Sequence, residues 1–159
     1  IQGGPLEHVI AGKAAAFKEA LDPSFAEYSQ QVIANAQAMT KVFNQAPEAR
    51  LISGATDNHL LLIEVTGFGL NGKEAEAILD SVNITVNKNS IPFEQLSPFK
   101  TSGIRIGTPA ITSRGFKEED AVEVAKLIVQ VLKDPENTAV HDEVKAAVAA
   151  LTKKYPLYN

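Results

Sequence analysis

Residues 101–110, which read Thr-Ser-Gly-Ile-Arg-Ile-Gly-Thr-Pro-Ala, constrain the fold more than any other stretch of the chain. Side chains of a strand point alternately to opposite faces, so Ile104 and Ile106 share one face and Arg105 lies on the other. We expect the isoleucines to be buried. Glycines two residues before and after the arginine would leave its face clear for a ligand. The segment predicts a strand with one buried face and a lone cation on its open face.

Two interpretations of Arg105 follow from this spacing, and the spacing supports them equally. A guanidinium is a planar, permanently charged fork that matches a carboxylate or a phosphate, which indicates a pocket for a small anion. The alternative is an ion pair with an acidic residue of the same chain.

Two long helices are predicted before any strand. From residue 6 to 21 apolar side chains recur at three- and four-residue spacing, as on one helix face. Asp22 followed by Pro23 is typical of the start of a second helix, which we expect to end near Pro47.

Strands and helices then alternate. Short apolar runs at 51–52, 60–65 and 84–86 predict strands, and the residues from 87 to 100 predict a loop. Asn71, with a glutamate three residues later, predicts a capped third helix, and two more helices are expected from about residues 118 and 140. This order predicts a two-layer α/β (α+β) domain whose small sheet is covered by helices on one face.

The composition and the missing motifs exclude or disfavour several kinds of site and partner. The chain has no cysteine, so it has no disulfide, thiolate nucleophile or cysteine-type zinc site. A net charge of -4 argues against a nucleic-acid surface, and no apolar run is as long as a membrane span. We expect neither nucleic acid nor membrane as a partner. Phosphate-loop, dinucleotide and nucleophile-elbow motifs are also missing from the sequence.

Three further signals each have two interpretations. Gly3 and Gly4, before a proline and a helix, predict either an anion cradle or an ordinary turn. The polar run around Asn89 predicts either hydrogen bonds to a polar heterocyclic ligand or an ordinary solvent-exposed loop. His59 is either a base or a structural histidine.

Eight short blocks occur in a fixed order along the chain. They are QGGPL (2–6), HVIA (8–11), TDNHL (56–60), GKEA (72–75), ITVNKN (84–89), TSGIRIGTPA (101–110), RGF (114–116) and KYPLY (154–158). Together they resemble the bacterial-type serine hydroxymethyltransferase family nearly from end to end. The chain resembles the carboxy-terminal portion, beginning just after the segment that holds the cofactor lysine.

The resemblance implies a fold-type-I enzyme that depends on pyridoxal phosphate and acts as a homo-oligomer in the cytoplasm. That enzyme transfers the hydroxymethyl carbon of serine to tetrahydrofolate and leaves glycine. Residues 1–48 would be the helical segment joining the large and small domains, and residues 49–159 would be the carboxy-terminal small domain.

The resemblance also implies roles for individual residues. Arg105 resembles the arginine that binds the substrate carboxylate, and Asn89 resembles the loop asparagine that hydrogen-bonds the folate pteridine. Pro98 and Phe99 resemble a loop near the folate site.

Gly3 and Gly4 resemble the backbone that reaches the cofactor phosphate across the dimer interface. The family's Schiff-base lysine and its other catalytic groups lie upstream, so we expect no catalytic residue here. The full-length protein is then expected to be active and the isolated segment inactive, because imine catalysis requires that lysine.

Two rival hypotheses remain at this point. One is another fold-type-I enzyme, such as an aminotransferase or a threonine aldolase, which also uses a small-domain arginine. The other is a non-catalytic assembly domain.

Overall fold

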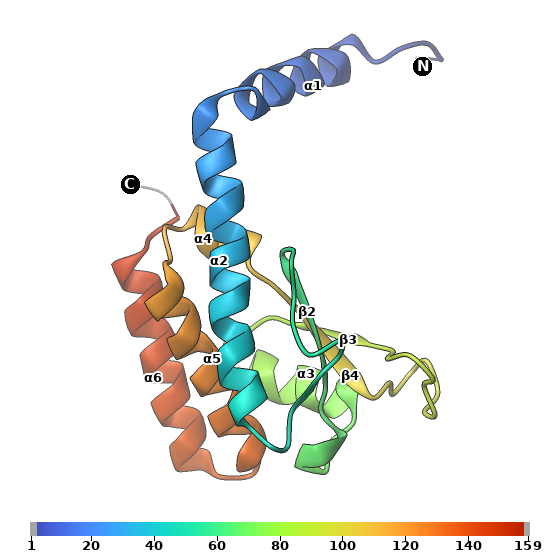
Figure 1. Cartoon of the computed structure of the whole chain (residues 1–159), viewed down its shortest axis with the longest axis vertical. Helices are drawn as coiled ribbons and strands as arrows, with labels where there is room; N and C mark the ends of the chain where they lie inside the picture. The colour runs from blue at the N-terminus through green and yellow to red at the C-terminus, as the bar shows by residue number, and fades with distance from the viewer. Residues whose placement is uncertain (1–2, 158–159) are drawn as a thin grey trace.

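A computed structural model describes residues 3–157, so the parts of the first and last family-like blocks at Gln2 and Tyr158 lie outside the described residues. The elements along the chain are α1 (Glu7–Ala20), α2 (Pro23–Gln45), β1 (Arg50–Leu51), β2 (Leu60–Glu64), the 3-10 turn η1 (Thr66–Phe68), α3 (Gly72–Ser81), β3 (Asn87–Asn89), β4 (Gly103–Gly107), α4 (Pro109–Ser113), α5 (Glu118–Lys133) and α6 (Thr138–Lys154) (Figure 1).

The two amino-terminal helices are confirmed, but they differ in packing. Asp22 caps α2 by accepting a hydrogen bond from the Ser24 backbone N–H at 2.9 Å, and α2 ends two residues before Pro47. The carboxy-terminal half of α2 buries Met39 and Phe43, whereas α1 buries no residue. Figure 1 shows α1 extending away from the body that α2 runs along.

The sheet has the strand order β1-β2-β4-β3, and every neighbouring pair is antiparallel. Arg105, on the central strand β4, is paired with Leu62 on β2 and with Asn87 on β3. The predicted arginine strand is confirmed with the expected alternation, since Ile104 and Ile106 are buried and Arg105 is exposed.

The predicted strand at residues 84–86 is wrong, because pairing with β4 begins only at Asn87. Ile84 and Val86 are buried in the core, so their alternation reflects burial rather than pairing. Residues 87–89, predicted as loop, form the edge strand instead. Its outer backbone is satisfied by a side chain, as the Lys88 N–H donates to Glu76 Oε1 at 2.9 Å.

The helices cover one face of the sheet, as predicted. Buried side chains of the two central strands point to that face: Leu61, Ile63, Ile104 and Ile106. Helices α2 and α3 contact the sheet, α5 packs on both of them, and α6 packs on α5. Figure 1 shows α2, α5 and α6 together on one side of the strands. The opposite face of the sheet remains available for a site.

The remaining predicted helices are also confirmed. Asn71 and Glu74 form the expected capping box at the start of α3. The short helix α4, which directly follows the arginine strand, was not predicted. Among residues 3–157, no helix is long and apolar enough to span a bilayer, and no three acidic or histidine side chains gather as a metal site would require.

Candidate functional site

Arg105 projects from the middle of β4 on the face of the sheet that the helices leave open. Within residues 3–157 its guanidinium makes no ion pair and no hydrogen bond, since the ion pairs there join other residues: Arg50–Glu64, Lys133–Glu48 and Lys154–Asp120. The internal ion pair left open by the sequence is therefore absent from the described residues. The cation is available to a ligand.

The two glycines that flank Arg105 have different surroundings. A Cβ at Gly103 would lie 2.8 Å from Ile91 Cγ2 and 3.0 Å from the backbone oxygens of Asn89 and Ile63. A Cβ at Gly107 would meet only flexible or more distant atoms, the nearest being Leu60 Cδ2 at 3.3 Å. Gly103 therefore permits close chain packing and does not clear space for a ligand, contrary to the expectation, whereas the surroundings of Gly107 are less crowded.

A cleft of about 600 Å³ lies on this open face. Its lining residues are Ile52, Ser53, Ala55, Thr56, Asp57, Asn58, Leu60, Leu62, Asn89 and Arg105. Asn89 is two residues along β3 from Asn87, the partner of Arg105, so alternation places both side chains on the same face. The structure thus brings together the two residues expected to bind the substrate carboxylate and the folate.

The amide nitrogen of the Asn89 side chain already makes a hydrogen bond within the chain. Its Nδ2 donates to the Ser90 carbonyl oxygen at 2.7 Å. Within the described part of the chain no group donates to its Oδ1, so this oxygen is available as an acceptor.

The opposite wall of the cleft is the loop at 52–58, which the sequence did not predict as part of a site. Side chains of this loop fix its own shape: Thr56 Oγ1 donates to the Leu60 carbonyl at 2.7 Å, and Asn58 Oδ1 accepts from the Leu60 N–H at 2.8 Å. The run Thr-Asp-Asn, one residue before the start of β2, is the sequence signal that marks such a self-bonded turn. Asp57 adds an acid to the cleft.

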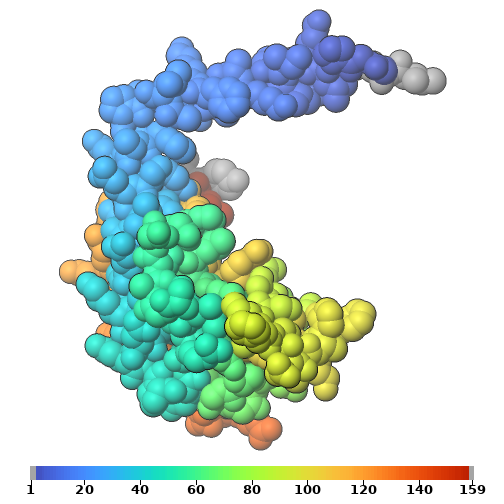
Figure 2. Space-filling view, turned by 45° about the vertical axis from the view of Figure 1, so that its right-hand side comes forward, coloured from blue at the N-terminus to red at the C-terminus, as the bar shows by residue number. Residues whose placement is uncertain are grey.

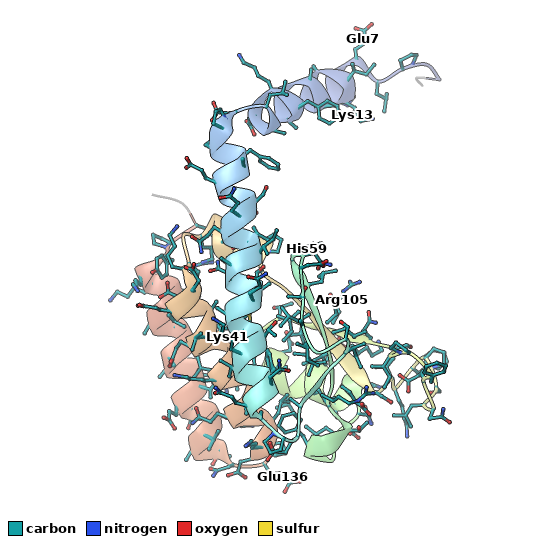
Figure 3. The ribbon with its side chains drawn as sticks, in the orientation of Figure 1. Glu7, Lys13, Lys41, His59, Arg105 and Glu136 are labelled. Carbon is teal, nitrogen blue, oxygen red and sulfur yellow. The ribbon has the colours of Figure 1, made fainter. Side chains whose placement is uncertain are left out.

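His59 does not line this cleft. It is exposed and borders a neighbouring hollow of about 390 Å³ with Tyr28 and Pro109, among others. Its side chain makes no hydrogen bond within residues 3–157, and the Thr108 N–H binds only its backbone oxygen, at 3.1 Å. The structure therefore supports neither interpretation of His59, as a catalytic base or as a hydrogen-bonded structural residue. Figure 3 shows His59 and Arg105 at separate places along the strands.

Pro98 and Phe99 lie on the loop between β3 and β4, outside the cleft lining. Both are exposed, Phe99 to 82%. Figure 2 shows this loop protruding from the body as a yellow lobe. The structure therefore does not place Pro98 and Phe99 in the cleft with Asn89.

Gly3 and Gly4 border a hollow of about 380 Å³ at the start of α1, together with Pro5, Glu7 and His8. No atom lies within 4 Å of a Cβ built on either glycine, so their backbone is open. Figure 3 shows Glu7 at the outer end of α1, far from Arg105. This hollow and the cleft are two separate hollows on one chain.

Two sequence comparisons with known proteins give the family of the chain. The family model described as serine hydroxymethyltransferase matches residues 1–128. The chain belongs to the serine hydroxymethyltransferase family. It is 59% identical over 157 residues to the serine hydroxymethyltransferase of Lactobacillus acidophilus, and the match covers 99% of this chain and 38% of that relative. Family membership confirms the resemblance and, with it, a fold of type I.

The cleft alone does not fit the cofactor of this family. An imine with pyridoxal phosphate requires an amine at the cofactor aldehyde, and none of the ten lining residues is a lysine. The arginine and the asparagine fit an anionic and a polar ligand instead.

Proposed function

We propose that this chain is the carboxy-terminal part of a pyridoxal-phosphate-dependent glycine hydroxymethyltransferase. The full-length enzyme interconverts serine and glycine and transfers the one-carbon unit to tetrahydrofolate. The observation that carries the proposal is Arg105, which forms no ion pair with any described residue and shares a cleft with Asn89.

Arg105 binds the carboxylate of serine or glycine. Two parallel N–H···O bonds fix both the position and the plane of a carboxylate, which orients the rest of the amino acid. The rigid centre of the sheet supports this role, since β4 is paired on both sides at Arg105. Pyridoxal phosphate, held by parts of the enzyme outside this chain, supplies the electron sink of the reaction.

Asn89 hydrogen-bonds the folate through its Oδ1, which accepts from N–H groups of the pteridine and receives no hydrogen bond from residues 3–157. Pro98 and Phe99 border the same folate farther from the cleft. Their exposure on a protruding loop supports contact with a ligand that extends beyond the cleft.

Gly3 and Gly4 approach the cofactor phosphate of a second subunit. The separation of their hollow from the cleft of the same chain supports a site built from two copies, and hence a homo-oligomer. On family membership alone we also propose a cytoplasmic enzyme and a division into a helical segment, 1–48, and a small domain, 49–159.

The role of Arg105 is tested in the full-length protein with R105A and R105K. We expect kcat/KM for serine to fall about 30-fold or more in R105A, because a charge-assisted hydrogen-bonded pair contributes about 2 kcal/mol or more. R105K keeps the charge and loses the fork, so it recovers only part of the activity. R50K is the matched control outside the cleft. Wild-type kcat/KM in R105A would overturn the proposal.

The folate role separates this function from other fold-type-I enzymes. N89A should weaken folate-dependent transfer more than folate-independent cleavage of a hydroxy amino acid, and both rates are measured on the same preparation. Equal losses would instead favour a threonine aldolase or an aminotransferase. A full-length wild-type protein with neither activity and no pyridoxal phosphate binding would favour an assembly domain.

A further inference from the structure

One acidic side chain organises the loop that connects the two proposed binding residues. The loop runs from residue 90 to 102, directly after Asn89 and three residues before Arg105. Glu94, near its middle, accepts four hydrogen bonds. Oε2 accepts from the N–H groups of Ile91 at 3.2 Å and Ser102 at 2.8 Å. Oε1 accepts from the Leu96 N–H at 2.9 Å and from Ser102 Oγ at 2.6 Å.

These bonds join the two ends of the loop. Ile91 follows Asn89 by two residues, and Ser102, which is buried, precedes Arg105 by three. The same Ile91 side chain covers Gly103, beside the arginine. The Glu94 carboxylate therefore connects the chain leaving β3 to the chain entering β4.

The local energetics favour a carboxylate at this position over a neutral side chain. Partial burial of Glu94 opposes its charge, but the hydrogen bonds from Ser102, Leu96 and Ile91 outweigh it and lower the pKa to about 2. Glu94 also repels the carboxylate of Glu64. The hydrogen bond from Thr66 Oγ1 at 2.6 Å and the ion pair with Arg50 nevertheless hold the pKa of Glu64 below its usual value.

The loop also contains backbone that needs such support. Phe93 and Thr101 have positive φ angles of 60° and 58°, a region that non-glycine residues rarely adopt. Strained backbone persists only where surrounding interactions determine it, and Glu94 binds within three residues of both positions.

We infer that Glu94 is a positioning residue: its carboxylate fixes the loop at 90–102 and thereby holds Asn89 and Arg105 in one geometry on the open face of the sheet. The inference rests on the proposed function. When the loop is already ordered before the ligand binds, binding does not lose the conformational entropy of ordering it, so the affinity is higher. Glu94 acts on the affinity for tetrahydrofolate and not on the reacting atoms.

The first test measures amide hydrogen exchange in the 159-residue chain for wild type, E94Q, E94D and E136Q. E94Q places an NH₂ group against N–H and O–H donors, so we expect exchange at Ile91 and Ser102 to accelerate about tenfold or more. E94D keeps the charge with a shorter reach and restores part of the protection. Glu136 is exposed at the far end of the molecule, and E136Q should match wild type. Wild-type exchange in E94Q would overturn the inference.

The second test measures steady-state kinetics of the full-length protein. E94Q should raise the KM for tetrahydrofolate about tenfold while kcat at saturation changes little, and E136Q should change neither. A general loss of folded enzyme would instead lower the apparent kcat at constant KM, and that result would contradict a positioning role.

The two proposals fail differently. A full-length wild-type protein without folate-dependent transfer would overturn the proposed function and, with it, the role of Glu94 in that reaction. An active wild type whose KM for tetrahydrofolate is unchanged in E94Q would overturn the inference alone.

Discussion

Arg105 and Glu94 lie 11 residues apart in the chain, but their charged groups differ in the hydrogen bonds that they make within the protein. Glu94 accepts four hydrogen bonds from its own loop, whereas the Arg105 guanidinium donates none to the described residues. A charge that is satisfied internally stabilises structure, and a charge held open on a rigid strand is available for binding. We therefore assign Glu94 to the support of the loop and Arg105 to ligand binding.

The pH dependence of stability should contain a contribution from Glu94. A carboxyl whose pKa is lower in the folded state stabilises the fold above its unfolded pKa, and this stabilisation is lost as the pH falls through the folded pKa. For Glu94 the window runs from 4.5 down to about 2. We expect E94Q to be about 2 kcal/mol less stable at pH 7, and its deficit should shrink as the pH falls through that window. Denaturant unfolding of both proteins from pH 7 to pH 2 measures the difference; a deficit that does not vary with pH would contradict the assignment.

The two glycines of β4 give a matched pair of substitutions. In G103A the new methyl would meet two backbone oxygens and Ile91 at 2.8 to 3.0 Å, and backbone yields little, so we expect a loss of about 2 kcal/mol. G107A would meet a movable leucine side chain at 3.3 Å and should cost less than about 1 kcal/mol. Urea unfolding of the two variants tests the order, and equal losses would contradict it.

At the scale of elements, local signals predicted helices better than strands. Asp22 with Pro23 and Asn71 with Glu74 act within one turn of chain, so the starts of α2 and α3 were predictable from the sequence. Strand pairing depends on distant residues: Asn87–Asn89 form β3 because β4 lies beside them, and nothing in their polar composition predicts a strand.

In the candidate site, too, features set by local sequence could be predicted, and features that depend on distant residues could not. Alternation alone placed Arg105 on an open face, because the side-chain period of a strand is a local property. The loop at 52–58 reaches the cleft through the antiparallel pairing of β1 and β2, and Glu94 acts across eight residues to Ser102. Such contacts depend on the whole fold, so the sequence pattern did not reveal them.

The α3 cap provides a prediction at this scale. N71A removes the oxygen that accepts the Glu74 N–H at 3.0 Å, and we expect a loss of about 1 kcal/mol with an unchanged denaturant slope. K73A, in the same helical turn and exposed, is the control and should lie within about 0.5 kcal/mol of wild type. Thermal or urea unfolding gives both values, and an N71A variant as stable as K73A would contradict the role of the cap.

At the scale of the whole molecule, α1 is the part that the fold leaves unpartnered. Every described residue of this helix is at least partly exposed, and Phe17 is exposed to 67%. Apolar surface of this kind is usually covered by another part of a protein or by another copy. The body, in contrast, has its own core between α2, α3, α5 and the sheet.

Self-association of the 159-residue chain should therefore depend on the apolar side of α1. F17K should reduce association in sedimentation experiments at increasing concentration. A15K adds the same charge two residues away, on the opposite side of the helix, and should reduce it less. Equal effects of the two variants would indicate that net charge, and not the apolar side of α1, controls association.

The central claim is that Arg105 binds the carboxylate of a small amino acid. The most direct measurement compares the affinities of glycine and glycinamide, which lacks the carboxylate charge, for the full-length protein and its R105A variant. Wild type should bind glycine about tenfold or more tightly than glycinamide, and R105A should lose most of this preference. An R105A variant that retains the full wild-type preference for glycine would contradict the claim.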